Sequence, residues 1–438
     1  MLKNIRDIDG ISYKYYKDHK ELEKLIAADL SLLLTEAYES FHQKDSGNPA
    51  GEKIHNIPAP ATSILGREKE IETARKYLQS GEKRLLTFTG PGGSGKTRLS
   101  IEVGHKLSSD FPFIHFIELA AIHDPDLTPD AIAHGMGLRE AGEKRADRII
   151  KEYVANKSML LILDNFEQIA DDASVLIAEL LSSCPELKVL ITSRMALRIR
   201  GEQEMPILPL DTPDLSNTID YYTLSDYAAV ALFCQRAGDI NPDFTIDEEN
   251  LKSIAEICRS LDGLPLAIEL AAARIRLLSP KSMLEKLTPR LHLLTNGAKD
   301  LPERQQTMYQ TIAWSYNLLD QDEAALFRQL AAFPGGARID IIESVCYDNK
   351  CGFDILSGME GLVRKSLVYA KETSQGEICF NMLETIREFA LDQLKKKNEQ
   401  SEIFNQHAHY FADLTEHAEP YLISGERNSW LIKLEDEI

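Results

Sequence analysis

The chain has 438 residues, enough for two to four domains that fold without disulfides or metals. Hydrophobic residues make up 43% and charged residues 27%, a balance that excludes disorder for most of the chain. The formal charge of -20 excludes a surface that as a whole attracts nucleic acid or an anionic membrane, so any bound anion needs a local site.

No apolar run is long enough to span a membrane, and the first ten residues lack the apolar core of a signal peptide. We therefore expect a cytoplasmic protein with no membrane partner. The six cysteines are scattered without a Cys-x-x-Cys pair, so they indicate neither a zinc site nor a disulfide framework. We interpret them as buried thiols.

Residues 1–57 are predicted to form an N-terminal helical segment and a linker. Apolar residues recur at helical spacing over 21–41, so one face of this helix needs a partner. The stretch SGNPAGEKIHNIPAP combines Gly, Pro and polar residues without a period, which is typical of a linker, here ending near Pro60.

Residues 58–210 alternate short apolar runs with helical patterns. The runs LLTFT, FIHFIEL, MLLILD, KVLIT and MPILPL indicate strands, and the helices between them predict a parallel sheet covered on both faces. Residues 211–305 show only successive helical patterns, which predict a helical lid domain. The third of these helices starts at Gly263-Leu264-Pro265, where the missing N–H of proline is harmless.

Residues 306–396 change pattern again. Several helical patterns precede two short strands, SLVYA and EICFNM, and another helix begins near Leu383, which together are typical of a winged helix. Residues 397–438 predict two amphipathic helices, and the chain ends inside the second. This ending indicates either a shortened chain or the start of an α-helical repeat whose later units are absent.

Residues 90–97 read GPGGSGKT and match the phosphate-loop pattern G-x-x-x-x-G-K-[ST] between a predicted strand and a predicted helix. Glycines let successive backbone N–H groups point at phosphate oxygens, and the helix N-terminus adds positive potential. Lys96 would reach the β- and γ-phosphates, and the Thr97 hydroxyl would bind Mg²⁺. The residues predicted here to bind nucleotide are Gly90, Gly92, Gly93, Ser94, Gly95, Lys96, Thr97 and Arg98.

The run MLLILD ends in Asp164. A buried strand would deliver this carboxylate to the carboxyl edge of the sheet beside the loop, where it can hold a magnesium-bound water. A base that activates water normally follows such an aspartate directly, but the next residue is the amide Asn165. Glu167 is the only close substitute, so we expect slow hydrolysis, which suits a switch better than a motor.

The run LITSR places Arg194 at the end of another predicted strand. An isolated arginine in this position is more often part of a surface ion pair, but its order relative to the other motifs favours a sensor of the γ-phosphate. The predicted catalytic set is therefore Lys96, Asp164, Glu167 and Arg194.

The motifs occur in the order ILGREKE, GPGGSGKT, LLILDNFEQ, LITSR and GLPLA. In this order they resemble the nucleotide-binding (NB-ARC) core of signal-transduction ATPases with numerous domains, the STAND class. This class includes apoptotic activator ATPases, plant disease-resistance proteins and bacterial transcriptional regulators. The segments around TMYQTIAWSYNLL and NMLETIREFA resemble the winged helix of the bacterial branch, whose members often carry tetratricopeptide repeats after it.

The resemblance implies roles for further residues. Leu65 and Arg67 would line an adenine pocket, Pro265 would pack on the base or sugar, and the winged helix would close over ADP in a resting state. Exchange for ATP would swing the winged helix outward and expose a surface that forms a homo-oligomer. Many relatives have Met-His-Asp where this chain has Met382-Leu383-Glu384, and leucine cannot make the histidine's bond to the ADP β-phosphate.

Winged helices often bind DNA, but residues 301–394 contain fourteen acidic and eight basic residues, which is a poor footprint for phosphate neutralisation. We therefore favour a protein-facing wing and a regulatory ATPase switch. A DNA-binding transcriptional regulator is the second hypothesis, and a turnover enzyme such as a kinase or motor is the third. The sensed ligand or protein is expected to bind C-terminal repeats, and the output is expected from the N-terminal segment.

Overall fold

The computed structural model describes residues 53–60, 62–122, 124–138, 145–214, 221–287, 290–294, 306–346, 354–372 and 376–422. The helix predicted over 21–41 and the second of the two predicted C-terminal helices lie outside these residues. Among the described residues, no helix combines the length and the apolar character needed to cross a membrane.

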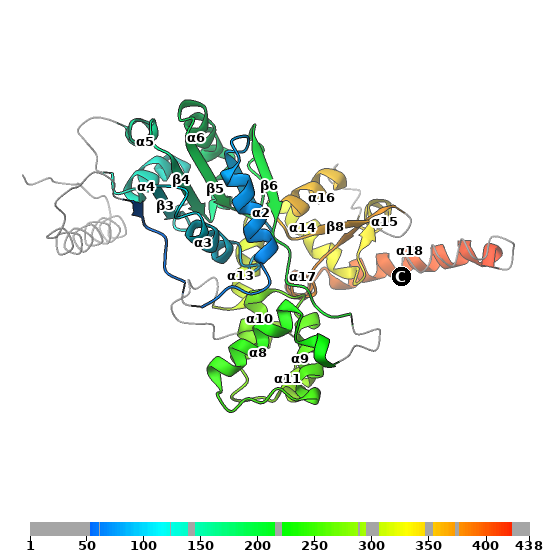
Figure 1. The fold of residues 1–438 in the computed structure, drawn as a ribbon. Coiled ribbons are helices and arrows are strands. Elements are labelled where there is room, and N and C mark those ends of the chain that lie inside the picture. Colours follow the sequence, from blue (N-terminus) through cyan, green and yellow to red (C-terminus); the bar gives the residue numbers. More distant parts are fainter. Residues whose placement is uncertain are drawn as a thin grey trace, which may run out of the picture. The chain divides into compact units, whose positions relative to one another are not determined.

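A six-stranded sheet forms the centre of the first half of the described chain (Figure 1). Its strands are β1 (Ile54–His55), β2 (Leu85–Thr89), β3 (Phe113–Glu118), β4 (Met159–Asp164), β5 (Leu187–Thr192) and β6 (Glu202–Pro206). They pair in the order β1-β3-β4-β5-β2-β6, and every pair is parallel. The predicted parallel sheet is therefore confirmed.

The helices of this region are α2 (Glu68–Gln79), α3 (Lys96–Lys106), α4 (Thr128–Gly135), α5 (Ala146–Val154) and α6 (Ala170–Ser183). Two short 3-10 helices, Pro125–Leu127 and Phe166–Gln168, accompany them. Strand β4 shows how both faces become apolar: Leu160 packs with residues of α2 and α3, whereas Leu161 packs with residues of α4, α5 and α6. This alternation is the period of two that an extended strand imposes.

A helical lobe follows the sheet. It comprises α7 (Tyr221–Leu224), α8 (Ala228–Ile240), α9 (Glu248–Ser260), α10 (Pro265–Ala272), α11 (Pro280–Glu285) and α12 (Arg290–Leu293). Helix α10 begins at Pro265 as expected, and the preceding Gly263 has a φ of 66°. A Cβ on Gly263 would lie 2.1 Å from the carbonyl oxygen of Leu210, so this turn requires glycine.

The remaining described elements are α13 (Met308–Tyr316), α14 (Gln321–Gln329), a 3-10 helix (Leu330–Ala332), β7 (Ala337–Arg338), α15 (Ile339–Val345), α16 (Ile355–Arg364), β8 (Tyr369–Glu372), β9 (Ile378–Asn381), α17 (Glu384–Lys396) and α18 (Gln400–Leu422). Strands β7, β9 and β8 form an antiparallel sheet in that order. Helices α14, α15 and α16 together with this small antiparallel sheet confirm the predicted winged helix. Helix α18 follows it.

One continuous apolar core joins the helical lobe to the winged helix. It includes Leu264 and Leu270 of the lobe together with Ile312, Phe327 and Phe389 of the later helices. The helical lobe and the winged helix therefore share one cluster of buried side chains, and the apolar residues of α10 belong to it.

Three short strands differ from the sequence-based expectation. Strand β1 lies inside the predicted linker, and β7 was not expected, because two-residue strands leave too little pattern to detect. Strand β6 covers Glu202–Pro206, whereas the apolar run MPILPL suggested residues 205–210. Strand β6 is an edge strand with partly exposed residues, so apolar content did not mark it, and Leu208 is exposed.

The described cysteines carry free thiols, in agreement with the expectation. Cys184, Cys258, Cys346 and Cys379 are buried and Cys234 is partly buried, whereas Cys351 lies outside the described residues.

Candidate functional site

The loop between β2 and α3 has the backbone of a phosphate cradle. Gly90, Gly93 and Gly95 all have positive φ values, of 142°, 82° and 92°, and Gly95 is the residue that precedes the first turn of α3. A Cβ on Gly90 would lie 2.5 Å from the carbonyl oxygen of Ile207, so the loop passes too close to the end of β6 for any side chain.

Lys96 is the first residue of α3, and its side chain folds back over the loop. Its Nζ donates to the carbonyl oxygens of Gly90 at 2.7 Å and Pro91 at 2.9 Å. Burial lowers the pKa of Lys96 to about 8, although the negative charge of Glu167 acts in the opposite direction. The ammonium group thus lies where phosphate oxygens would replace carbonyl oxygens as its partners.

Asp164 lies at the end of β4 and is 1% exposed. Its Oδ1 accepts from the hydroxyl groups of Thr97 at 2.7 Å and Thr192 at 2.5 Å, and its Oδ2 accepts from the side-chain amide of Asn165 at 2.5 Å. Burial raises the pKa of Asp164 to about 6, while the two hydroxyl groups lower it. The arrangement couples the first turn of α3 to the ends of β4 and β5.

Arg194 follows β5 and is 6% exposed. Its Nε donates to Glu167 Oε1 at 3.2 Å, and its Nη2 approaches the carbonyl oxygen of Thr311 on α13 at 3.4 Å. A Cβ on Gly92 would lie 2.7 Å from Thr311 Cγ2, so α13 lies directly against the loop. The guanidinium group therefore joins the 3-10 helix after β4 to a helix of the C-terminal part.

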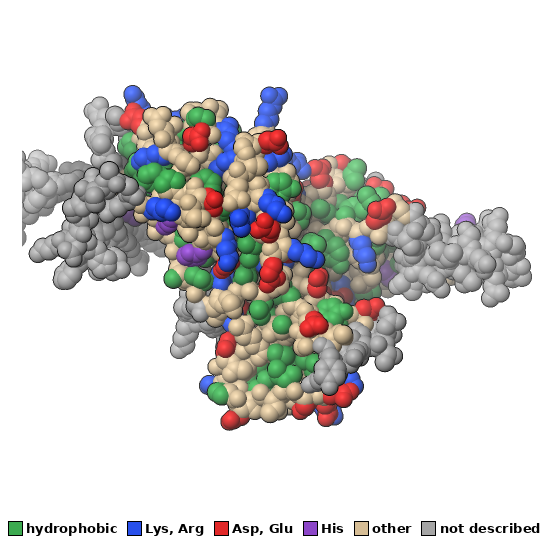
Figure 2. All heavy atoms as spheres, in the orientation of Figure 1, with side chains coloured by type: hydrophobic (Ala, Val, Ile, Leu, Met, Phe, Trp, Pro, Cys, Tyr) green, Lys and Arg blue, Asp and Glu red, His purple; other side chains and the backbone are tan. Residues whose placement is uncertain are grey.

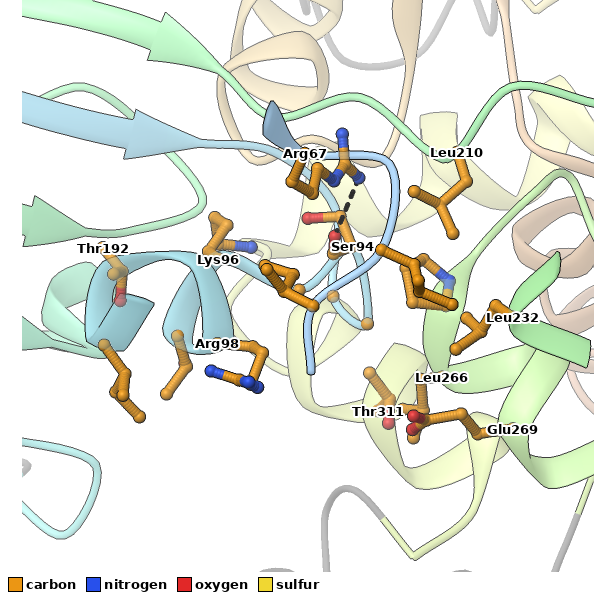
Figure 3. Close-up of a pocket in the computed structure, with 18 of the residues that line it drawn as sticks. Arg67, Ser94, Lys96, Arg98, Thr192, Leu210, Leu232, Leu266, Glu269 and Thr311 are labelled. Atoms are coloured by element: carbon orange, nitrogen blue, oxygen red, sulfur yellow. Dashed lines mark hydrogen bonds between the residues drawn. The ribbon is translucent and has the colours of Figure 1, made fainter. Parts of the chain in front are cut away.

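A cavity of about 350 Å³ opens beside these groups (Figure 3). Its apolar lining consists of Ile64, Leu65, Ile101, Leu210, Leu232, Pro265 and Leu266. Helix α10 closes one side, because the N–H of Leu266 donates to the carbonyl oxygen of Gly93 at 3.2 Å. The cavity thus has a polar end at the loop and an apolar region, the usual composition of a small-molecule site.

Most of the residues predicted for the site line this one cavity. They are Leu65, Arg67, Gly92, Gly93, Ser94, Gly95, Lys96, Thr97, Arg98, Glu167, Arg194 and Pro265. Gly90 and Asp164 do not line it directly. Gly90 bonds Lys96 through its carbonyl oxygen, and Asp164 lies beneath Thr97.

Arg67 and Arg98 make bonds that the sequence did not predict. Arg67 donates to the carbonyl oxygens of Ser94 at 3.2 Å and Leu208 at 2.6 Å, so it holds the loop against the segment after β6. Arg98 donates to the carbonyl oxygen of Thr62 and, at 3.4 Å, to Glu102. Both guanidinium groups therefore support the walls of the cavity.

Several further residues of the site were not predicted from the sequence, including the four named next. Thr311, Arg236 and Glu269 line the cavity from α13, α8 and α10, and Thr62 lies in the segment before α2. Thr311, Arg236 and Thr62 are ordinary residues in ordinary helices or loops, so no local pattern singles them out. Only Glu269 had a detectable signal, since it follows Pro265 by four residues and shares its helix face.

Leu383 does not replace the histidine of the Met-His-Asp pattern. It is the residue before the first turn of α17, and it is not among the residues that line the cavity. The N-terminus of α17 instead bonds the helical lobe, because the N–H and hydroxyl group of Thr385 donate to Asp262 Oδ2 at 3.1 and 3.2 Å. Burial raises the pKa of Asp262.

The residues present fit a nucleotide with Mg²⁺. The hydroxyl group of Ser94 is fully buried in the loop and makes no hydrogen bond to the described residues, so an acceptor is missing there. No group of three or more His, Cys, Asp or Glu side chains within the described ranges could hold a metal ion. A site with one carboxylate and one hydroxyl group suits Mg²⁺, which usually takes its other ligands from phosphate and water.

The parallel sheet, the glycine loop and the strand-end aspartate define a P-loop NTPase fold. The family model of the NB-ARC domain matches residues 67–201, and that of a winged helix-turn-helix domain matches residues 319–395. The chain belongs to the NB-ARC family, in the branch that carries a winged helix.

The chain is also similar in sequence to several known proteins. A Mycobacterium tuberculosis protein named as an HTH-type transcriptional regulator is 36% identical over 76% of this chain and 36% of its own length. An uncharacterised protein of the same species is 34% identical over 79% of this chain and 84% of its own length. A disease resistance protein of Arabidopsis thaliana is 26% identical over 69% of this chain and 30% of its own length. The chain thus spans about a third of the regulators that it matches.

Proposed function

We propose that this chain is a nucleotide-dependent molecular switch that binds ADP and ATP with Mg²⁺ and hydrolyses ATP slowly. The observation that carries the proposal is the position of Arg194 between Glu167 and the Thr311 carbonyl oxygen. A third phosphate at this end of the cavity would offer charged acceptors, which bind a guanidinium group more strongly than a neutral carbonyl. The presence or absence of the third phosphate would thereby change how strongly Arg194 binds the Thr311 carbonyl oxygen on α13.

The two ends of the cavity support an adenine nucleotide. Leu65, Leu210 and Pro265 would contact the base and sugar, and the loop amides with Lys96 would bind the phosphates. Thr97 and Asp164 would hold Mg²⁺, which neutralises charge on the phosphate oxygens when it is bound. A switch of this type would work in the cytoplasm, where ATP and Mg²⁺ are abundant.

Slow hydrolysis is supported by the surroundings of Asp164. The neighbouring Asn165 donates its amide to Asp164, and Glu167 forms an ion pair with Arg194 at 3.2 Å. A carboxylate held by a guanidinium group is a weak base for water. Hydrolysis would then reset the switch and would not drive continuous work.

The contact of α13 with the phosphate loop supports ADP as the resting ligand. In this proposal, exchange for ATP releases α13 and the winged helix and exposes a face through which copies of the chain assemble. The signal would be a ligand or protein bound by C-terminal helical repeats.

The direct test is to purify the full chain, denature it and identify the released nucleotide. We expect ADP, and we expect the Lys96→Ala variant to release none and to bind no added ATP. Unchanged ATP affinity in that variant would refute the site. Turnover well above about one per second without a partner would favour a turnover enzyme over a switch.

A DNA-binding regulator acting through its winged helix is the second candidate, and the winged helix-turn-helix match favours it. The acidic side chains of α16, the third helix of the winged helix after α14 and α15, argue against DNA binding. The exposed side chain of Glu360 pairs with Arg198 at 2.6 Å, and Asp354 lies at the N-terminus of the helix. Basic and acidic side chains are also mixed on the face shown in Figure 2.

Duplex binding by the full chain separates the two candidates. A regulator that contacts several phosphates should bind DNA with an affinity that falls steeply as salt rises. We expect no such binding in either nucleotide state. If the chain does bind DNA in a salt-dependent way, and the charge-reversal variant Arg364→Glu on α16 abolishes that binding, the result would favour the DNA-binding regulator.

A further inference from the structure

A carboxylate and a guanidinium group form a pair at the rim of the cavity. Arg236 Nε donates to Glu269 Oε1 at 2.9 Å, and Arg236 Nη2 donates to the hydroxyl group of Thr62 at 2.9 Å. A third bond, at 3.3 Å, runs from Arg236 Nη1 to Asp239. Thr62, Arg236 and Glu269 line the cavity, whereas Asp239 does not.

The position of Glu269 along α10 relates it to the phosphate loop. Pro265 and Leu266 lie against the loop, since Pro265 Cγ is 3.9 Å from a Cβ on Gly95 and the Leu266 N–H bonds Gly93. Glu269 follows one helical turn later on the same face, about 5.4 Å further along the axis. Glu269 therefore lines the cavity beyond the two residues of α10 that contact the loop.

The side chain of Glu269 is directed into the cavity and has an acceptor to offer. Figure 3 shows it extending from α10 toward the space that separates this helix from Arg98. Only Oε1 takes a hydrogen bond from the described residues, so Oε2 is available. Arg236 fixes the carboxyl group in place, and the side chain of Glu269 is 38% exposed, which leaves it accessible to a ligand.

The chemistry of the rim selects among the parts of a nucleotide. Phosphates would be repelled by a carboxylate, and the base fits the apolar lining. The sugar hydroxyl groups are donors, and a carboxylate accepts two of them at once, as acidic residues do for ribose in dinucleotide-binding folds. We propose that Glu269, positioned by Arg236, accepts hydrogen bonds from the ribose hydroxyl groups and makes the switch selective for ribonucleotides.

This inference rests on the nucleotide-binding function proposed above, and a binding series tests it. Calorimetry on the nucleotide-free full chain would compare ADP with its 2′-deoxy, 3′-deoxy and 2′,3′-dideoxy analogues. We expect ADP to bind about tenfold or more tightly than the dideoxy analogue, because a hydrogen bond to a charged acceptor is lost. Equal affinities within about threefold in the unaltered chain would overturn the inference.

Two variants assign the selectivity to Glu269. In Glu269→Ala the affinity for ADP should exceed that for the dideoxy analogue by no more than about threefold. The change should come from weaker binding of ADP and not from tighter binding of the dideoxy analogue. Asp239→Ala is the matched control, because it removes another carboxylate from Arg236 without changing the cavity lining. It should keep the ratio of the unaltered chain.

The outcomes for this inference and for the proposed function are distinguishable. If Glu269→Ala still binds ADP about tenfold more tightly than the dideoxy analogue, the role of Glu269 is refuted. Normal ADP binding in the same experiment would leave the proposed nucleotide-binding function standing. Failure of the unaltered chain to bind any of the four ligands refutes both. Thermal melting without nucleotide checks the fold of each variant, and if Glu269→Ala does not fold, the analogue series on the unaltered chain decides.

Discussion

At the scale of single residues, Lys96 is the group whose charge matters most. Burial lowers its pKa to about 8 in the described state, where carbonyl oxygens are its partners. Phosphate favours the charged ammonium group, so nucleotide raises this pKa and binding above pH 8 requires uptake of a proton. Affinity is therefore fully present below pH 8 and is lost as the pH rises through this value.

We predict that ADP binds about tenfold more weakly at pH 9 than at pH 7, because the pH then exceeds the free-state pKa by about one unit. Isothermal titration at pH 7, 8 and 9 measures this. Lys96→Arg is the control, since arginine stays charged and any residual binding should be independent of pH. A constant affinity of the unaltered chain over this range would contradict the role of Lys96.

His115 on β3 gives a prediction about stability. It is 2% exposed, neither ring nitrogen bonds a described residue, and burial lowers its pKa to about 4. An unfolded chain takes up the proton near pH 6.5, so stability is complete above this pH and declines as the pH falls toward 4. We expect a loss of about 2 kcal/mol in the free energy of unfolding between pH 7 and pH 5.

Urea unfolding at the two pH values measures the loss from His115. The variant His115→Leu keeps the site apolar and removes the group that takes up the proton. Its free energy of unfolding should therefore fall by about 2 kcal/mol less between pH 7 and pH 5 than that of the unaltered chain. Equal losses in the two proteins would show that other groups cause the acid sensitivity.

At the scale of elements, the bond between Asp262 and α17 holds the helical lobe to the winged helix. Asp262 accepts both donors of Thr385 at the first turn of α17, and it lies three residues before Pro265, which lines the cavity. A cavity residue and the winged helix are thus joined through one short turn.

We predict that Asp262→Ala lowers the free energy of unfolding by about 1 to 2 kcal/mol, as loss of an N-cap does, and raises amide exchange throughout α17. The matched control is Asp354→Ala. Asp354 caps α16 through Leu356 at 3.2 Å, and among the described residues it has no bond to the helical lobe, so its loss should affect α16 alone. Hydrogen exchange followed by mass spectrometry gives both readouts, and unchanged exchange in α17 would contradict this role.

At the scale of the whole molecule, the described bonds that join the loop after β5 to the C-terminal part include three from Arg194, Ser366 and Arg198. Arg194 bonds Thr311, the hydroxyl group of Ser366 donates to the carbonyl oxygen of Arg194 at 2.6 Å, and Arg198 pairs with Glu360. The first two are buried or partly buried, whereas the third is exposed. Exposed ion pairs contribute little, so we expect Arg194 to carry the coupling.

We predict that ATP with Mg²⁺ raises amide exchange in α13 relative to ADP, because the third phosphate competes with the Thr311 carbonyl for Arg194. In Arg194→Ala the two nucleotides should give the same exchange, whereas the control Arg198→Ala should keep the difference. A full response in Arg194→Ala would show that coupling runs by another route.

Local motifs account for what was predictable about the fold and the phosphate end of the site. The glycine loop, Lys96 and Thr97 are contiguous, and Asp164 follows an apolar strand whose end is visible in the sequence. Parallel strands place their carboxyl ends at one edge of a sheet, so convergence of these groups follows from the pattern alone. The short edge strands β1 and β7 left no such pattern.

The sequence by itself therefore determined the family, the parallel sheet and the phosphate-binding loop, because each is encoded by residues close together in the chain. Tertiary structure alone decided that Thr311, Glu269 and Asp262 meet the loop, the cavity and α17. Thr311 approaches Arg194 across 117 positions, and Asp262 bonds Thr385 across 123. Contacts over such separations depend on how helices pack, and no spacing rule within one helix or strand encodes them.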